Sequence, residues 1–411
     1  MRHIYASLDI GSDTIKIAVC ELYENKLNLL ASTCTKAKGI KRGLITDFEL
    51  ASITIRQAFR EIEDMLGFKV NKIIASVPSY LAEYNIVRAS IDIDSGSMIT
   101  NKDVMKSLEQ AILTKKIEGR EVVTILPVDF RINDQIVVKD PVGLNGSKLS
   151  TRSILVTVPK KNVYSVVGLL EKIGIEVVDI SINNIGDLYS LKNKNFENGV
   201  SAIVNIGEDT TNISLFNMGI IIKSIVLSIG SKSIDNDLSN KYKMDLDTIK
   251  KVKLRYGIAS KSKASSKETI ECKNSDGKVI KINQYELSEL VENRIKDILD
   301  MVKNELNSLT RKRIDYIIIT GGMSNMQAFE ITANDIFGKI VNIGSIKILG
   351  VRDNIYSSVI GNIIYFISKL KLKGQNYTMI DDKDLESSNA VVTRSTSDSA
   401  LGKMFGYFFN D

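Results

Sequence analysis

Two stretches of the chain, residues 7–19 and 202–216, share one pattern of apolar and polar positions. The first reads SLDIGSDTIKIAV and the second reads AIVNIGEDTTNISLF, so in each an apolar run is followed by a polar turn and a second apolar run. This pattern predicts a β-hairpin in both places, with a glycine where the turn begins. A third stretch, residues 317–325 (IIITGGMSN), predicts a buried strand that ends at a glycine pair.

Strand and helix patterns alternate along most of the remaining chain, which is typical of an α/β fold. Residues 81–158 differ, because several β-type runs surround one helical stretch there, and they predict a small α+β insertion. The helices that periodicity and capping predict are residues 47–66, 101–114, 162–173, 285–309 and 353–370.

The duplicated hairpin pattern indicates two similar halves. The first half comprises residues 1–80 and 159–198, with 81–158 as its insertion. The second comprises residues 199–237 and 305–370, with a helical subdomain at 238–304. We expect a disordered polar linker at residues 371–399 and an amphipathic helix at 400–411.

The composition argues against several classes of protein. The 411 residues are 44% hydrophobic and 25% charged, which is ordinary for a globular chain with two or more domains. The net charge of +6 is too small to indicate nucleic acid as a main partner, but it is compatible with an anionic membrane or an acidic peptide. Since His3 is the single histidine, histidine-based metal sites and catalytic triads are close to excluded. We expect no signal peptide, because the N-terminus enters a predicted strand at once. We also expect no membrane-spanning helix, because no apolar run approaches ~18 residues.

The two hairpin turns and the glycine pair carry the candidate chemistry. Two such turns facing each other present backbone N–H groups to a chain of phosphates. The glycine pair lets a ligand pack against bare backbone before a helix begins. Each element alone is an ordinary feature. The three in this order resemble the actin-like ATPase superfamily, which includes actin, the heat-shock chaperone ATPases and the sugar kinases.

One segment narrows this resemblance to a family. Residues 122–149, VVTILPVDFRINDQIVVKDPVGLNGSKL, closely resemble a stretch of the bacterial cell-division family FtsA, and the resemblance extends over essentially the whole chain. It implies a two-lobed actin-like fold, a duplicated ribonuclease-H-like α/β architecture with a nucleotide in the cleft. It also implies ATP and Mg²⁺ as cofactors and polymerisation into filaments. Such filaments tether the tubulin-like division protein FtsZ to the cytoplasmic face of the membrane at the division site.

The resemblance assigns roles to residues of both hairpins. Asp9 is expected to hold Mg²⁺ through water and is the candidate catalytic residue, since Mg²⁺ keeps most of its waters. Lys16 lies two strand positions past Thr14, on the same face, which aims its ammonium group at phosphate oxygens. The residues expected to contact the nucleotide are Gly11, Ser12, Asp13, Lys16, Gly207, Glu208, Asp209, Thr210, Lys253, Gly321, Gly322 and Met323.

The second hairpin departs from the pattern of the superfamily. Asn205 replaces an acid that helps to hold the metal or the attacking water, so we expect ATP hydrolysis to be weak or undetectable. Glu208 and Asp209 replace two glycines, and a carboxylate ~4 Å from a phosphate costs about 1 kcal/mol even at the dielectric constant of water. We expect the turn to direct both side chains outward or towards Mg²⁺. Lys250 stands where relatives have a glutamate for the ribose hydroxyls, which predicts altered nucleotide affinity or base selectivity.

Three segments are expected to contact partners. Arg294 aligns with the helix that binds the acidic C-terminal peptide of FtsZ in the family. Residues 81–158 are candidates for contacts with other division proteins, and the family's filaments imply contacts between copies of the chain. The apolar stripe of the predicted membrane-docking helix consists of Leu401, Met404, Phe405, Phe408 and Phe409.

Two alternative functions are weighed against this one. A small-molecule kinase of the sugar-kinase class needs a carboxylate base beside the phosphates, and Asn205 argues against it. An adaptor of type IV pilus machines shares the insertion but has no need for its own amphipathic tail, so Phe405 and Phe408 distinguish the two.

Overall fold

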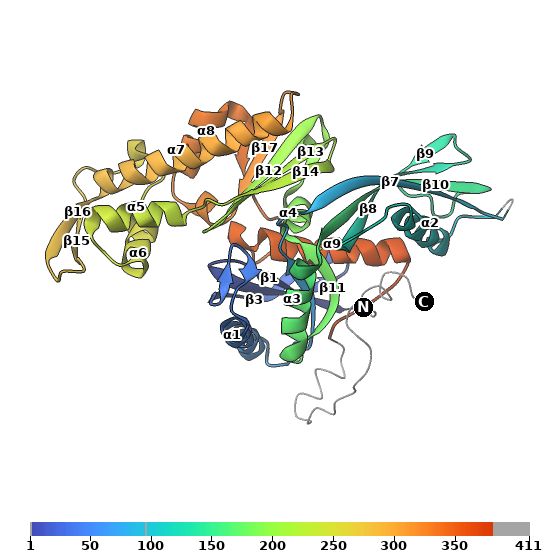
Figure 1. The fold of residues 1–411 in the computed structure, drawn as a ribbon, viewed down its shortest axis with the longest axis horizontal. Helices are drawn as coiled ribbons and strands as arrows, with labels where there is room; N and C mark the ends of the chain where they lie inside the picture. Colours follow the sequence, from blue (N-terminus) through green and yellow to red (C-terminus); the bar gives the residue numbers. More distant parts are fainter. Residues whose placement is uncertain (1, 95–96, 381–411) are drawn as a thin grey trace. The chain divides into compact units, whose positions relative to one another are not determined.

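The computed structural model describes residues 2–94 and 97–380 of the chain. Its contacts define two compact units, and each unit contains a five-stranded sheet (Figure 1). Among the described residues, unit 1 comprises 2–94, 97–190, 347–351 and 358–380, and unit 2 comprises Leu191–Ile346 and Arg352–Ser357. In the described part of the chain, no helix is both long enough and apolar enough to cross a membrane.

The sheet of unit 1 has the strand order β11-β6-β1-β2-β3. Strands β1, β2 and β3 pair antiparallel, whereas β1, β6 and β11 pair parallel. The elements of this region are β1 (His3–Ile10), β2 (Thr14–Tyr23), β3 (Lys26–Lys36), β4 (Ile40–Lys41), β5 (Leu44–Ile45), α1 (Phe48–Leu66), β6 (Lys72–Val77), α3 (Lys160–Lys172), β11 (Glu176–Ile182), α4 (Asn183–Leu191) and α9 (Ser357–Lys373).

Local sequence explains where α1 begins and ends. The side chain of Asp47 accepts a hydrogen bond from the backbone N–H of Leu50, which caps the first turn. Gly67 follows the last turn with a φ of 76°, a conformation that favours glycine. Between these ends, residues such as Ile55 and Phe59 are buried where α1 packs on β2 and β3. The helix predicted at residues 47–66 is confirmed.

The insertion between β6 and α3 has its own sheet, with the strand order β7-β10-β8-β9. Helix α2 packs on this sheet and begins with a capping box formed by Thr100 and Asp103. Their shared core includes Val104, Phe130 and Leu149. The bounds are β7 (Glu83–Asp92), α2 (Asn101–Leu113), β8 (Arg120–Ile132), β9 (Ile136–Val138) and β10 (Lys148–Pro159).

The sheet of unit 2 has the strand order β14-β13-β12-β17-β18, which repeats the order of unit 1 strand for strand. The pairing repeats as well, because β12, β13 and β14 are antiparallel and β12, β17 and β18 are parallel. The predicted α/β duplication is therefore confirmed. The elements are β12 (Val200–Ile206), β13 (Thr211–Asn217), β14 (Ile220–Leu227), α5 (Lys232–Tyr242), α6 (Leu246–Tyr256), β15 (Thr269–Lys273), β16 (Val279–Asn283), α7 (Gln284–Leu309), β17 (Tyr316–Thr320), α8 (Phe329–Phe337) and β18 (Val341–Ile343).

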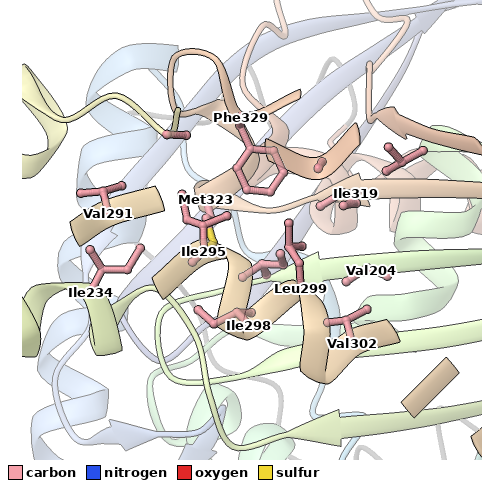
Figure 2. Packing of buried hydrophobic residues seen from close by; sticks show 14 of the residues in the cluster. Val204, Ile234, Val291, Ile295, Ile298, Leu299, Val302, Ile319, Met323 and Phe329 are labelled. Atoms are coloured by element: carbon pink, nitrogen blue, oxygen red, sulfur yellow. The ribbon is translucent and has the colours of Figure 1, made fainter. Parts of the chain in front are cut away.

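The core of unit 2 is organised around the long amphipathic helix α7. Its residues Val291, Ile295, Ile298, Leu299 and Val302 are buried in one apolar cluster (Figure 2). The region 238–304 is not helical throughout, because β15 and β16 form an antiparallel hairpin within it. Their alternation of exposed and partly buried residues is short and lysine-rich, so it does not stand out from a polar loop in the sequence.

The segment that follows α9, residues 374–380, is here called the C-terminal strap. The backbone N–H of Ile4 donates to Thr378 Oγ1 (2.9 Å), and the backbone N–H of Met379 donates to the carbonyl of Ile4 (2.9 Å). Met379 and Ile380 are buried. The predicted start of the linker at residue 371 is therefore wrong: α9 continues to Lys373, and the strap then packs against β1.

Candidate functional site

The first hairpin, between β1 and β2, closes through a tight turn. Asp9 lies opposite Lys16 and Ile10 lies opposite Ile15 in the strand register. The backbone N–H of Gly11 donates to the carbonyl of Thr14 at 3.1 Å. A Cβ at Gly11 would lie 2.8 Å from that carbonyl oxygen. The turn therefore requires the glycine that its sequence provides.

Asp9 is 5% exposed, and both of its carboxylate oxygens have partners within unit 1. Lys16 Nζ lies 3.3 Å from Oδ2, and Asn183 Nδ2 donates to Oδ1 at 2.7 Å. Ser76 Oγ in turn donates to Asn183 Oδ1 at 2.8 Å. Because a carboxylate only accepts hydrogen bonds, Asp9 fixes which end of the Asn183 amide faces it.

The sequence analysis does not name Asn183, although a signal for it exists. Asn183 directly follows β11, which is parallel to β6 and β1. The carboxyl ends of parallel strands lie at one edge of a sheet, where ligand-binding side chains gather. A polar residue directly after a predicted buried strand is therefore a candidate for the site that contains Asp9.

Lys16 carries a stable positive charge. Burial alone lowers the pKa of its ammonium group, but Asp9, together with Cys34 and Asp13, outweighs that effect and the net pKa is raised. The other turn residues are held by a neighbouring loop: Ser12 Oγ accepts from the N–H of Gly43 (2.9 Å), and the carbonyl of Asp13 accepts from the N–H of Ala37 (2.6 Å). The first hairpin thus places one fixed cation beside one fixed carboxylate.

The second hairpin, between β12 and β13, repeats this backbone. The N–H of Gly207 donates to the carbonyl of Thr210 at 2.9 Å, as Gly11 does to Thr14 in the first hairpin. Asn205 lies opposite Asn212, at the positions that correspond to the ion pair of the first hairpin. The two turns therefore match in register and differ in charge.

The two acidic residues of the second turn are each paired with a lysine. Lys250 Nζ on α6 lies 2.8 Å from Glu208 Oε2, and Lys232 Nζ on α5 lies 3.5 Å from Asp209 Oδ1. The backbone N–H groups of Ser231 and Lys232 also donate to the carbonyls of Gly207 and Glu208. From the sequence we expect these two carboxylates to point outward or towards Mg²⁺. Their pairing with Lys250 and Lys232 is not predicted from the sequence. In this structure Lys250 is an ion-pair partner of the turn.

The two glycines after β17 have different surroundings. Gly321 has a φ of 90°, and a Cβ there would lie 2.5 Å from Asn205 Oδ1 and 2.5 Å from the carbonyl oxygen of Ile206. Gly322 is exposed, so its backbone is accessible to a ligand. The side chain of Met323 is buried in the unit 2 core near Ile295 (Figure 2). For Met323, only the backbone remains a candidate for nucleotide contact.

Two other predicted site residues are engaged in ion pairs. Lys253 Nζ lies 2.7 Å from Asp235 Oδ1, and both side chains are 3% exposed, so this lysine is held in a buried pair. Arg294 lies 2.6 Å from Asp237 and 3.3 Å from Asp297. A peptide carboxylate that binds Arg294 must therefore compete with two carboxylates of the chain itself.

The donor set of the first hairpin suits Mg²⁺ that arrives with phosphate. Among residues 2–94 and 97–380, no group of three or more His, Cys, Asp and Glu side chains is arranged to hold a metal ion. Mg²⁺ in nucleotide sites commonly uses one or two carboxylates together with waters and phosphate oxygens. Asp9 fits that role, whereas a site made of protein side chains alone does not. The predicted tail residues, Leu401, Met404, Phe405, Phe408 and Phe409, lie outside the described residues.

Solved structures with a similar fold cover most of the chain. The type IV pilus biogenesis complex PilM–PilN matches with a TM-score of 0.58 and 12% identity, over 88% of this chain and 98% of that chain. MreB5 of Spiroplasma citri bound to ADP matches with a TM-score of 0.54 and 16% identity, over 91% of this chain and 99% of that chain. This likeness shows an actin-like fold.

Family models and curated relatives identify the family. The model described as "Cell division protein FtsA" matches residues 202–361, and "SHS2 domain inserted in FTSA" matches residues 83–157. Cell division protein FtsA of Bacillus subtilis (strain 168) is 26% identical over 382 residues, which cover 91% of this chain and 86% of that protein. Cell division protein FtsA of Enterococcus faecalis is 23% identical, over 99% of this chain and 98% of that protein. With an FtsA-type core, an FtsA-type insertion and relatives of nearly equal extent, this chain belongs to the FtsA family of bacterial cell-division proteins.

Proposed function

We propose that this chain binds ATP with Mg²⁺, polymerises, and tethers FtsZ filaments to the cytoplasmic face of the membrane at the division site. The observation that carries the proposal is the pair of register-matched hairpin turns in a member of the FtsA family. The fold offers further support, since MreB5 of Spiroplasma citri has solved structures bound to ADP and to AMPPNP.

The nucleotide contacts follow from the two turns. Backbone N–H groups of the turns that begin at Gly11 and Gly207 bind the phosphates, and the charged Lys16 adds an ammonium group. The exposed backbone at Gly322 packs beside the adenosine. Asp9 orients the waters of Mg²⁺, and the metal, when bound, offsets the negative charge of the phosphates. ATP hydrolysis is slow, because Asn205 is neutral and supplies no carboxylate to orient an attacking water.

The acidic C-terminal peptide of FtsZ binds the subdomain at residues 238–304, which contains most of α7. Since Arg294 already holds Asp237 and Asp297, its contribution is an exchange of carboxylate partners rather than a new ion pair. The replacement Arg294→Glu therefore tests the residue: unchanged peptide affinity removes Arg294 from the site. Residues 81–158 are the surface proposed for other division proteins.

Membrane attachment depends on the segment beyond the strap. The four apolar side chains at helical spacing, Leu401, Met404, Phe405 and Phe408, contribute roughly 6–12 kcal/mol gross when buried, and ordering about ten residues offsets most of it. A single tail therefore binds weakly. Polymerisation raises the effective concentration of tails, so attachment increases steeply when filaments form.

The test is co-sedimentation of FtsZ with liposomes in the presence of this chain, with and without ATP. We expect FtsZ to pellet only when the wild-type chain and ATP are present, and to stay soluble with the Phe405→Glu variant. The matched control is nucleotide binding by Phe405→Glu, which should equal wild type. Pelleting of FtsZ by Phe405→Glu at the wild-type level would contradict the tethering role of the tail.

A further inference from the structure

Two acidic residues, Glu208 and Asp209, lie in the second turn, which is proposed to bind phosphates. The side chains of Glu208 and Asp209 are only 18% and 17% exposed, so neither extends freely into water. A carboxylate held near a polyphosphate repels it, and the repulsion grows as the effective dielectric constant falls. The turn would therefore weaken nucleotide binding unless another group compensates its charge.

Lysines on two helices are placed to compensate these charges. Lys250, 27% exposed, lies 2.8 Å from Glu208, and this short, partly buried pair is the stronger of the two. Lys232 is 46% exposed and lies 3.5 Å from Asp209, so solvent screens that pair more.

Backbone hydrogen bonds also attach the second turn to the start of α5. The N–H of Ser231 donates to the carbonyl of Gly207 at 2.9 Å, and the N–H of Lys232 donates to the carbonyl of Glu208 at 3.0 Å. Gly230 permits this approach, because a Cβ there would lie 2.4 Å from the carbonyl oxygen of Glu208. The start of α5 therefore fixes the backbone of the turn, so Glu208 is held where Lys250 reaches it.

We propose that Lys250 is a positioning residue that compensates the charge of Glu208 and so makes the second turn compatible with a nucleoside triphosphate. The inference rests on the proposed ATP binding of this turn. Lys250 acts through Glu208 and does not contact the nucleotide itself. Lys232 performs the same task for Asp209 with a smaller effect.

If Lys250 has this role, then removing the carboxylate of Glu208 should restore the ATP affinity that is lost when Lys250 is replaced. Lys250→Ala removes the ammonium group 2.8 Å from Glu208 and should weaken binding of Mg-ATP at least about fivefold, the effect of one charge ~4 Å away in a water-like medium. Glu208→Gln in the same chain should restore the wild-type affinity, because no charge then needs compensation. Lys250→Arg keeps the positive charge and should bind Mg-ATP as wild type does.

The experiment is calorimetric titration of the full chain and its variants with Mg-ATP. Lys251→Ala is the matched control, since it removes the same charge from the neighbouring, exposed position of α6. It should leave the affinity unchanged. Thermal melting of each variant checks that the chain folds.

The outcomes separate this inference from the proposed function. Absence of ATP binding by the wild-type chain contradicts the proposed function itself. If the wild type binds ATP and Lys250→Ala binds it equally well, the compensating role is overturned. If the double variant Lys250→Ala, Glu208→Gln stays as weak as Lys250→Ala, then Lys250 contacts the nucleotide directly and the inference is also overturned.

Discussion

The two hairpins share one backbone and carry different charges. Each turn closes with a hydrogen bond from a glycine N–H to a threonine carbonyl, between corresponding strands of two sheets with the same order. At the equivalent strand positions the first hairpin has the pair Asp9 and Lys16, whereas the second has Asn205 and Asn212. Backbone geometry is thus retained in both units, and the charged strand pair is found in the first.

The charges of the second hairpin lie within its turn instead. Glu208 and Asp209 stand there, and lysines of α5 and α6 pair with them. This difference teaches that a repeated backbone does not imply a repeated chemical role. We infer that the first hairpin provides the carboxylate for the metal, and that the second provides a charge-compensated cradle.

The largest expected effect comes from breaking the support of the second hairpin at Gly321. A Cβ there meets the carbonyl of Ile206 at 2.5 Å, and the φ of 90° strains any other residue. Strain and overpacking of about 1–3 kcal/mol each predict that Gly321→Ala lowers the free energy of unfolding by roughly 2–6 kcal/mol. Chemical denaturation measures this, with Gly322→Ala as control, because its Cβ would have no heavy atom closer than 3.6 Å. Equal stability of both variants would show that the close approach is not needed.

The next effect concerns the strap that holds β1, the first strand of the first hairpin. Truncation after Lys373 removes the strap and its buried residues Met379 and Ile380, whereas truncation after Ile380 keeps them. We expect the shorter chain to lose roughly 2–4 kcal/mol of stability, comparable to emptying a buried site. The longer chain should melt as the full-length protein does. Identical melting of the two truncations would mean that the strap contributes nothing to unit 1.

A smaller effect is expected at Asn183, which orients the carboxylate of the first hairpin. Leucine is nearly isosteric with asparagine, so Asn183→Leu removes the hydrogen bond to Asp9 without opening a cavity. Since a hydrogen bond to a charged group contributes about 1.5–3 kcal/mol, we expect the Mg²⁺-dependent part of ATP affinity to fall by roughly tenfold or more. The control is Asn184→Leu, because that amide bonds to Tyr84 instead. A purely structural role for Asn183 would weaken metal-free and Mg²⁺-dependent binding alike.

Features set by local pattern could be predicted from the sequence. The long helix α7 and the cap of α1 at Asp47 follow from periodicity and capping, and both hairpins follow from apolar runs around a glycine turn. The actin-like class, by contrast, is implied by the resemblance of the two hairpins and the glycine pair, taken in their order, to that superfamily. The helix, the cap and each hairpin depend on residues close together in the chain.

Contacts between distant residues could not be predicted in the same way. Asn183 and Asp9 are 174 positions apart, and Lys250 and Glu208 are 42 apart, so no local pattern relates them. The polar composition of the strap predicts a linker, although two of its apolar residues, Met379 and Ile380, are buried. Met323 follows the glycine pair, but its burial depends on how the next turn packs against α7.

The central claim is that the effect of Mg²⁺ on ATP binding depends on a carboxylate of the first hairpin and not on the second hairpin. The direct measurement is ATP affinity by calorimetry, in Mg²⁺ and in excess chelator, for the wild type, Asp9→Asn and Asn205→Ala. We predict that Mg²⁺ strengthens ATP binding by the wild type and by Asn205→Ala, and that Asp9→Asn binds ATP equally with and without the metal. A full Mg²⁺ effect in Asp9→Asn, or its loss in Asn205→Ala, would contradict this division between the two hairpins.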